Sequence, residues 1–131
     1  MTVGDKPAGV KTILYIEDNE ANRKIVRQLL KNTRYSLIEA VDGEAGVAMA
    51  LKGRPDLVLM DLQLPKISGL EAIRRLRTQG PTATTPIIAI TSFALSGDEQ
   101  MAKEAGATAY VAKPYSPREL LALIRKTVPE A

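Results

Sequence analysis

The chain has 131 residues and a net charge of +3, and it contains no cysteine, histidine or tryptophan. A chain of this length suits one globular domain with a single hydrophobic core. The absence of cysteine and histidine excludes disulfide frameworks, thiolate and imidazole metal ligands, and catalysis that needs a histidine base. Any chemistry must therefore come from carboxylates, hydroxyls, lysines and arginines.

The N-terminal sequence and the charge balance exclude further classes of protein. Residues 1–10 (MTVGDKPAGV) lack the apolar core of a signal peptide, and apolar runs of about five residues are far too short to cross a bilayer. We therefore expect a cytoplasmic protein without membrane contact, with a flexible arm over residues 1–10. Eighteen basic against fifteen acidic residues, with four tyrosines and one phenylalanine, do not form a basic stripe with stacking aromatics, so we expect no direct DNA binding.

Five short apolar runs alternate with amphipathic stretches along the rest of the chain. They predict strands at Thr12 to Ile16, Ser36 to Val41, Asp56 to Met60, Ile87 to Ile90 and Thr108 to Ala112. Four of these runs are nearly continuous in apolar residues, as in strands buried on both faces of a parallel sheet. The second run is more mixed, which is typical of an edge strand.

Polar caps mark the helices between these strands. The expected caps, three of them in S-x-x-E capping boxes, are Asn19, Asp42, Ser68, Ser96 and Ser116. Gly53 and Gly106 stand where helices should end. Five repeats of strand and helix, joined by right-handed crossovers, predict a doubly wound α/β sandwich with helices on both faces of the sheet.

Polar residues follow the predicted strands at their carboxyl ends, where open α/β sheets bind ligands. Glu17 and Asp18 follow the first strand, Asp61 the third, Thr91 the fourth and Lys113 the fifth. Taken singly, Asp18 could cap a helix, Thr91 suits a strand, and Lys113 could be a surface residue. Asp61 is more informative, because an apolar strand that runs into a carboxylate needs a cation or hydrogen-bond donors there. Together the five residues predict a cation-dependent site for an anion.

The residue types narrow the chemistry of this site. Carboxylates without histidine or cysteine favour Mg²⁺ or Mn²⁺. A lysine beside such a cation suits a phosphoryl group, whose oxygens the two positive charges neutralise while a carboxylate attacks in line. A carboxylate nucleophile needs no base to deprotonate it, which matters in a chain without histidine.

From about residue 11 to residue 128 the chain resembles the receiver domain of two-component response regulators. The motifs that carry the resemblance are IEDN at 16–19, LMDLQLPKISGLE at 59–71, ITSFA at 90–94 and GATAYVAKPYS at 106–116. Within the family, TSFALSGDE at 91–99 is similar to single-domain regulators of the DivK type. The resemblance implies a flavodoxin-like (βα)5 receiver over residues 11–129, with a parallel sheet of order 2-1-3-4-5.

The resemblance also implies roles for the site residues. Asp61 would accept a phosphoryl group from a phosphohistidine on a sensor histidine kinase or a histidine phosphotransfer protein. Asp18 would bind Mg²⁺ directly and Glu17 through water, with Asp61 itself and the backbone carbonyl of Gln63 as the other protein ligands. Lys113, whose peptide bond to Pro114 is cis in the family, would pair with a phosphoryl oxygen.

A switch and two docking surfaces are implied in the same way. Thr91 and Tyr110 would form the switch pair, Ser92 would leave room for the phosphoryl group, and Gln63 and Phe93 would influence its hydrolysis. The fourth helix, fifth strand and fifth helix would bind a downstream protein effector, because the chain leaves no room for an output domain. The first helix would dock the phosphodonor, with steering by a basic set that could equally be an ordinary solvated face: Arg23, Lys24, Arg27 and Lys31.

Three alternatives stay open at this point. The chain could be a receiver excised from a longer regulator or a hybrid histidine kinase. It could be a haloacid-dehalogenase-like phosphatase, although that chemistry needs a second acid where Gln63 stands. It could also be a scaffold that is never phosphorylated. The intact set of site residues favours a phosphoacceptor signalling domain that is not an enzyme.

Overall fold

The structure is a computed structural model, which describes residues 9–91 and 97–130. The expected arm over residues 1–10 falls almost entirely outside this part of the chain. Ser92, Phe93 and Ser96 also lie outside it, and the predicted roles of Ser92 and Phe93 stay predictions. Among the described residues, no helix has the length and apolar character needed to cross a membrane.

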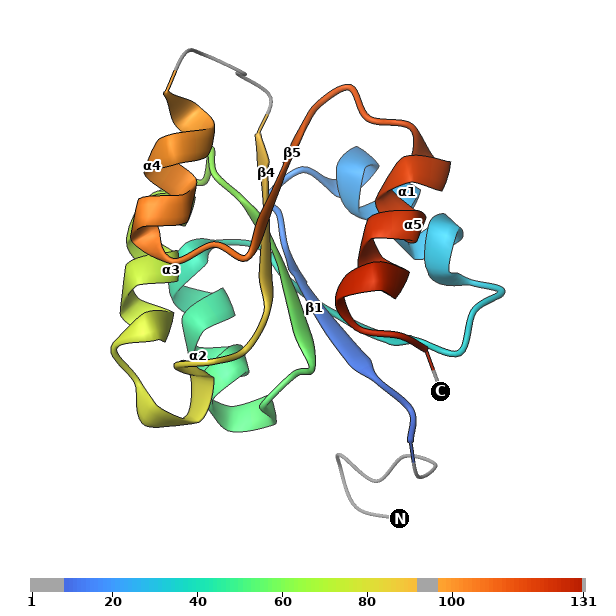
Figure 1. The fold of residues 1–131 in the computed structure, drawn as a ribbon, viewed down its shortest axis with the longest axis horizontal. Helices are drawn as coiled ribbons and strands as arrows, with labels where there is room; N and C mark the ends of the chain where they lie inside the picture. Colours follow the sequence, from blue (N-terminus) through green and yellow to red (C-terminus); the bar gives the residue numbers. More distant parts are fainter. Residues whose placement is uncertain (1–8, 92–96, 131) are drawn as a thin grey trace.

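Five parallel strands form one sheet in the order β2-β1-β3-β4-β5, as predicted. The strands are β1 Thr12–Ile16, β2 Ser36–Ala40, β3 Leu57–Asp61, β4 Ile87–Thr91 and β5 Ala109–Ala112. The helices are α1 Glu20–Leu30, α2 Gly43–Gly53, α3 Gly69–Arg77, α4 Asp98–Ala105 and α5 Pro117–Thr127, with a short 3-10 turn at Gly80–Thr82. Helices α1 and α5 cover one face of the sheet, and α2, α3 and α4 cover the other (Figure 1).

The strand boundaries differ from the prediction by one residue at several ends, and the difference at β3 bears on the site. Asp61 belongs to the strand, where it pairs with Ile90 of β4. Asp56 precedes the strand, and its carboxylate accepts a hydrogen bond from the backbone amide of Thr12 at 2.7 Å. Asp61 is therefore a strand residue that pairs with β4, and it does not lie in a loop.

Four of the five predicted caps are confirmed. The side chains of Asn19, Asp42, Ser68 and Ser116 accept hydrogen bonds from the amides three residues later, which satisfies donors that helix ends leave free. The prediction for α4 is wrong, because its cap is Gly97 and no side chain makes the capping bond. Gly97 has a φ of +92°, a backbone conformation that favours glycine.

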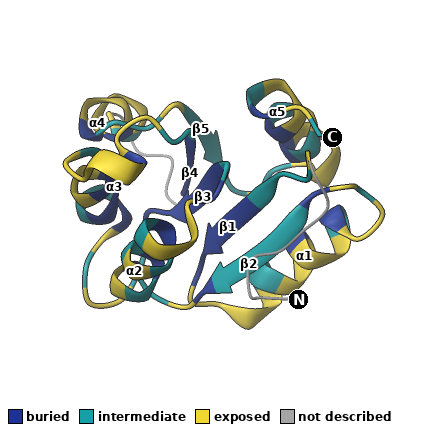
Figure 2. Cartoon of the chain, turned by 90° about the horizontal axis from the view of Figure 1, so that it is seen from below, coloured by how far each residue is buried: buried dark blue, intermediate teal, exposed yellow. Residues whose placement is uncertain are grey.

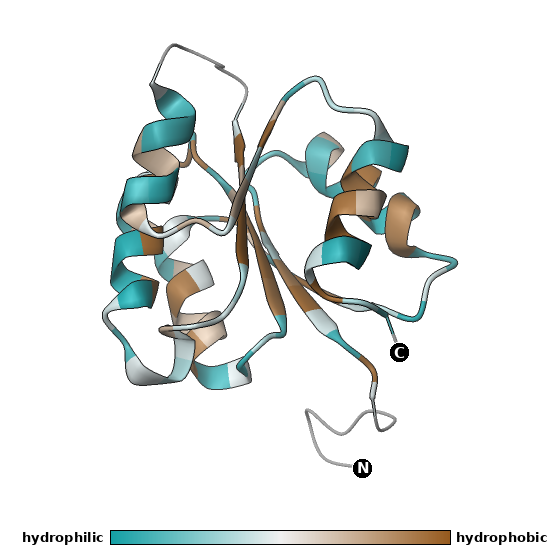
Figure 3. Cartoon of the chain, viewed as in Figure 1, coloured by the Kyte–Doolittle hydropathy of each residue, from teal (hydrophilic) through white to brown (hydrophobic). Residues whose placement is uncertain are grey.

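Two hydrophobic clusters lie on opposite faces of the sheet, each beneath its own helices (Figure 2, Figure 3). The three central strands are buried, and β2 is half-buried, as predicted for an edge strand. The fifth strand is equally apolar in sequence but only half-buried, because it forms the other edge. The core is thus built from β1, β3 and β4, whose carboxyl ends carry the polar residues.

Candidate functional site

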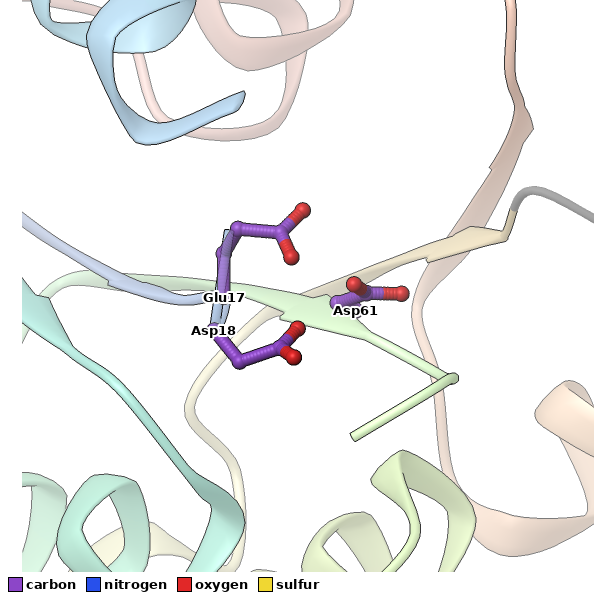
Figure 4. A group of neighbouring side chains, drawn as sticks. All are labelled: Glu17, Asp18 and Asp61. Atoms are coloured by element: carbon purple, nitrogen blue, oxygen red, sulfur yellow. The ribbon is translucent and has the colours of Figure 1, made fainter. Parts of the chain in front are cut away.

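Three carboxylates meet at the carboxyl ends of β1 and β3. Glu17 and Asp18 follow β1, and Asp61 is the last residue of β3. Each offers a carboxylate oxygen, and these oxygens all lie within 4.8 Å of one another (Figure 4). Glu17 and Asp61 are buried, at 1% and 3% exposure, whereas Asp18 is exposed. The cluster is therefore open to solvent on the side of Asp18.

The backbone around the cluster is held in place on both sides. The amide of Glu17 donates to the carbonyl of Ala40 at 3.0 Å, which continues the pairing of β1 with β2. The start of α3 packs against the end of β3, where a Cβ on Gly69 would lie 2.2 Å from the carbonyl oxygen of Asp61. Only glycine permits this approach, so α3 starts directly beneath Asp61.

Lys113 reaches the cluster from the loop after β5. Its backbone amide donates to the carbonyl of Thr91 at 2.7 Å, and its peptide bond to Pro114 is cis, as the resemblance implied. Its ammonium lies 2.8 Å from Glu17 Oε1 and 3.8 Å from Asp61 Oδ2. The lysine thus contacts both buried carboxylates, and the closer partner is Glu17.

The two buried carboxylates affect each other's ionisation. Burial and the hydrogen bond with Glu17 raise the pKa of Asp61, against opposing effects of the Gln63 amide and the Lys113 ammonium. Burial alone would raise the pKa of Glu17 too, but hydrogen bonds with Asp61 and Lys113 outweigh it and lower the pKa. Below about pH 7 the pair by itself therefore holds a proton on Asp61 and a negative charge on Glu17.

A divalent cation fits this donor set. All three side chains offer hard carboxylate oxygens close together, which suits Mg²⁺ or Mn²⁺. A cation would favour the ionised form of Asp61, against the burial and the neighbouring Glu17 that raise its pKa. The residues that could hold it are Glu17, Asp18 and Asp61, while the predicted role of the Gln63 carbonyl stays a prediction.

Gln63 contacts both the phosphoacceptor candidate and the switch candidate. Its backbone amide donates to Asp61 Oδ1 at 3.0 Å, and its side-chain amide donates to Thr91 Oγ1 at 2.7 Å. Tyr110 lies on β5 two residues before Ala112, the partner of Thr91 in the sheet register. Its ring is partly buried and packs against the cluster under α2, α3 and α4.

Two residues that bind Glu17 escaped the sequence analysis. The hydroxyl of Tyr15 donates to Glu17 Oε1 at 3.2 Å, and the side-chain amide of Asn22 donates to the same oxygen at 3.1 Å. The signal for Tyr15 is its spacing, because residues two apart on a strand share a face. Asn22 sits in the first turn of α1, five residues after Glu17, and only the chain reversal at Asn19 brings it back.

The family model of the response regulator receiver domain matches residues 13–125. The chain belongs to the response regulator receiver family. The polar-differentiation response regulator DivK of Brucella anthropi is 37% identical to this receiver over 121 residues, covering 92% of this chain and 98% of DivK. DivK of Brucella ovis is 36% identical over the same length.

Solved structures agree with this assignment. The receiver domain of the sensor histidine kinase PA1611 from Pseudomonas aeruginosa, described with magnesium coordinated in its active-site cleft, superimposes with a TM-score of 0.82 at 35% identity. It covers 89% of this chain and 96% of its own. The chemotaxis protein CheY4 of Vibrio cholerae superimposes with a TM-score of 0.85 at 28% identity, over 91% of this chain and 99% of its own. The acidic cluster here is typical of a receiver magnesium site.

Proposed function

We propose that this receiver accepts a phosphoryl group on Asp61 from a partner phosphohistidine in a Mg²⁺-dependent reaction. The observation that carries the proposal is the surroundings of Asp61, which lies with Glu17 and Asp18 in one oxygen cluster and 3.8 Å from the Lys113 ammonium. An anionic phosphoryl group needs positive charge at this point. Mg²⁺, when bound, would neutralise the carboxylates and the phosphoryl oxygens.

Three residues of the chain have separate roles in the phosphoryl transfer. A carboxylate oxygen of Asp61 attacks phosphorus, a P–O bond forms, and the P–N bond breaks with its electron pair left on the imidazole of the donor. The Gln63 amide holds Asp61 Oδ1 and so fixes the orientation of the nucleophile. Lys113 lies close enough to move from Glu17 to a phosphoryl oxygen.

The switch would follow from the added charge. A phosphoryl group on Asp61 offers strong acceptor oxygens, and the Thr91 hydroxyl would leave the Gln63 amide to donate to one of them. Tyr110 would then move toward the space near Thr91, since the two side chains lie on neighbouring strands. The changed surface of α4, β5 and α5 would bind a downstream protein.

The phosphodonor would dock over α1 and the loop after β5. An open hollow of about 390 Å³ lies there, lined by Asn22, Ile25, Lys113, Pro114, Tyr115 and Pro117. Of the basic residues on α1, Arg23 and Arg27 are paired with Glu20 and Glu39, so their steering charge is largely compensated. Lys24 is exposed and lies in the adjoining surface.

The proposal is tested by incubating the protein with Mg²⁺ and acetyl phosphate and measuring its intact mass. We expect one phosphoryl adduct that disappears when Mg²⁺ is chelated and is absent from Asp61→Asn. Asp56→Asn is the matched control, because Asp56 lies at the opposite end of β3 and should leave the adduct intact. No adduct in the wild-type protein would support a scaffold, and rapid turnover of many phosphate esters would support a phosphatase. Either result would contradict the proposal.

A further inference from the structure

Tyr15 is a tyrosine in the middle of a buried strand, and its hydroxyl faces the site. Its ring is fully buried among the apolar residues that lie between the sheet and helices α1 and α5. A phenol hydroxyl is costly to bury unless a partner accepts its hydrogen bond. It donates to Glu17 Oε1, at 3.2 Å, and it also hydrogen-bonds with the hydroxyl of Tyr115. Phenylalanine would fill the same space, so packing alone does not require the hydroxyl.

The donors around Glu17 are unevenly distributed between its two oxygens. Oε1 accepts from the Tyr15 hydroxyl, from the Asn22 side-chain amide at 3.1 Å and from the Lys113 ammonium at 2.8 Å. Oε2 accepts from the backbone amide of Asn19 at 3.2 Å. Three side chains therefore hold Oε1 and one backbone amide holds Oε2, in addition to the hydrogen bond that links Glu17 with Asp61.

The three donors to Oε1 differ in how firmly they are attached. The Tyr15 ring is enclosed in the core, and Asn22 belongs to the first turn of α1. Lys113 instead has a long flexible side chain, and the proposed transfer requires it to turn toward a phosphoryl oxygen. When it turns, Glu17 loses its shortest hydrogen bond, and the remaining side-chain donors to Oε1 are Tyr15 and Asn22.

We propose that Tyr15 and Asn22 are positioning residues that hold Glu17 Oε1, so that Glu17 keeps its place toward the cation while Lys113 moves. This inference rests on the proposed Mg²⁺ site and adds two residues to it. Partners that orient a metal ligand in this way are commonly as important to metal affinity as the ligand's own placement.

The experiment measures the affinity of the full chain for Mn²⁺ alone by electron paramagnetic resonance titration. We expect Tyr15→Phe and Asn22→Ala each to weaken Mn²⁺ binding by about tenfold, and the double variant to weaken it further. Asn22 is only partly buried, so its variant tests the inference even if Tyr15→Phe is poorly folded.

Tyr35→Phe is the matched control. Tyr35 is also buried in the cluster under α1 and α5, but its hydroxyl donates to the backbone carbonyl of Val128, away from the carboxylates. A merely structural role for Tyr15 predicts that both phenylalanine variants lose stability and bind Mn²⁺ as the wild type does. We expect both phenylalanine variants to lose stability, but of these two only Tyr15→Phe should bind Mn²⁺ more weakly.

The outcomes separate this inference from the proposed function. If the wild type binds Mn²⁺ and the Tyr15 and Asn22 variants bind it equally well, the positioning role is overturned and the proposed function stands. If the wild type does not bind Mn²⁺, the metal-dependent function is overturned, and the inference falls with it.

Discussion

The Lys113 ammonium lies 1.0 Å closer to Glu17 than to Asp61, with Nζ 2.8 Å from Glu17 Oε1 and 3.8 Å from Asp61 Oδ2. The positive charge of the lysine therefore offsets the negative charge of Glu17, the metal-ligand candidate, more than that of Asp61, the phosphoacceptor candidate. A cation at the carboxylates would compete with the ammonium for Glu17 and free it to meet an incoming phosphoryl group. The charge of Lys113 thus opposes cation binding and favours anion binding.

Replacing Lys113 should move these two affinities in opposite directions. In Lys113→Met, we expect Mg²⁺ to bind a few-fold more tightly, because a neighbouring positive charge is removed. We expect the phosphoryl analogue beryllofluoride to bind about tenfold or more weakly, because a charge-assisted hydrogen bond is lost. Calorimetric titration measures both. Weakening of Mg²⁺ binding as well would show that Lys113 is needed to hold Glu17 in place.

The hydrogen bond between Gln63 and Thr91 should resist the switch. The Thr91 hydroxyl accepts from the Gln63 amide at 2.7 Å and must reorient to donate to a phosphoryl oxygen. In Gln63→Ala this competing contact is gone, and we expect beryllofluoride to bind about 2- to 10-fold more tightly, the equivalent of one ordinary hydrogen bond. In Thr91→Val we expect weaker binding. If Gln63→Ala and the wild type bind beryllofluoride with equal affinity, the contact between Gln63 and Thr91 does not oppose the switch.

The titration of Asp61 should lower the stability of the metal-free protein as the pH rises from about 4 to about 7, against a smaller opposite effect of Glu17, whose pKa is lowered. Burial and Glu17 raise the pKa of Asp61 to about 7, whereas an aspartate in an unfolded chain has a pKa of about 3.9. Between these values the unfolded chain has released the proton that the folded protein retains, so a rising pH favours unfolding. Urea unfolding at several pH values measures this slope.

Asp61→Asn is the variant that isolates this titration. It should be more stable than the wild type by about 1 to 3 kcal/mol near pH 7.5 without metal, and nearly equal to it at pH 4. Mg²⁺ should reduce the difference in stability between Asp61→Asn and the wild type at pH 7.5, because Mg²⁺ binding favours the ionised carboxylate of Asp61. A metal-free stability that rises from pH 4 to pH 7 as in ordinary proteins, with no gain in Asp61→Asn, would contradict the raised pKa.

Gly69→Ala should be strongly destabilising, because the added methyl group would lie 2.2 Å from the Asp61 carbonyl oxygen and 2.6 Å from the Leu62 Cα. Both are backbone atoms, one at the end of β3 and one directly after it, and the Leu62 amide is bonded to the carbonyl of Ile90. They cannot easily move aside, so we expect a loss of about 3 kcal/mol in the free energy of unfolding. Gly80→Ala is the control, since its methyl group would meet nothing within 4 Å. Similar free energies of unfolding for the two variants would mean that α3 can move away from Asp61 without loss of stability.

Much of this fold could be predicted from the sequence because the strand and helix patterns agree with each other. The continuous apolar runs of β1, β3 and β4 indicated a buried parallel sheet, and side-chain caps such as Ser68 and Ser116 marked the helix starts. The start of α4 was mispredicted because Ser96 and Glu99 match the capping-box pattern, yet the helix begins one residue later behind Gly97. Local patterns locate elements well and their end residues less well.

The site was only partly predictable. Glu17, Asp18, Asp61 and Lys113 could be brought together from the sequence, because parallel strands end at the same edge of a sheet. The hydrogen bonds of Tyr15 with Glu17 and of Gln63 with Thr91 could not, since each depends on rotamers and on register between segments. Contacts of that kind can be identified only from the three-dimensional structure.

Phosphorylation of Asp61 is tested best by a measurement that locates the modified residue. After reaction with Mg²⁺ and acetyl phosphate, borohydride reduction converts an aspartyl phosphate to homoserine, which peptide mass spectrometry places in the sequence. We expect homoserine at position 61 and no modification at Glu17 or Asp18. Reduction at either of those residues, or no reduced residue in a protein that binds Mg²⁺, would contradict it.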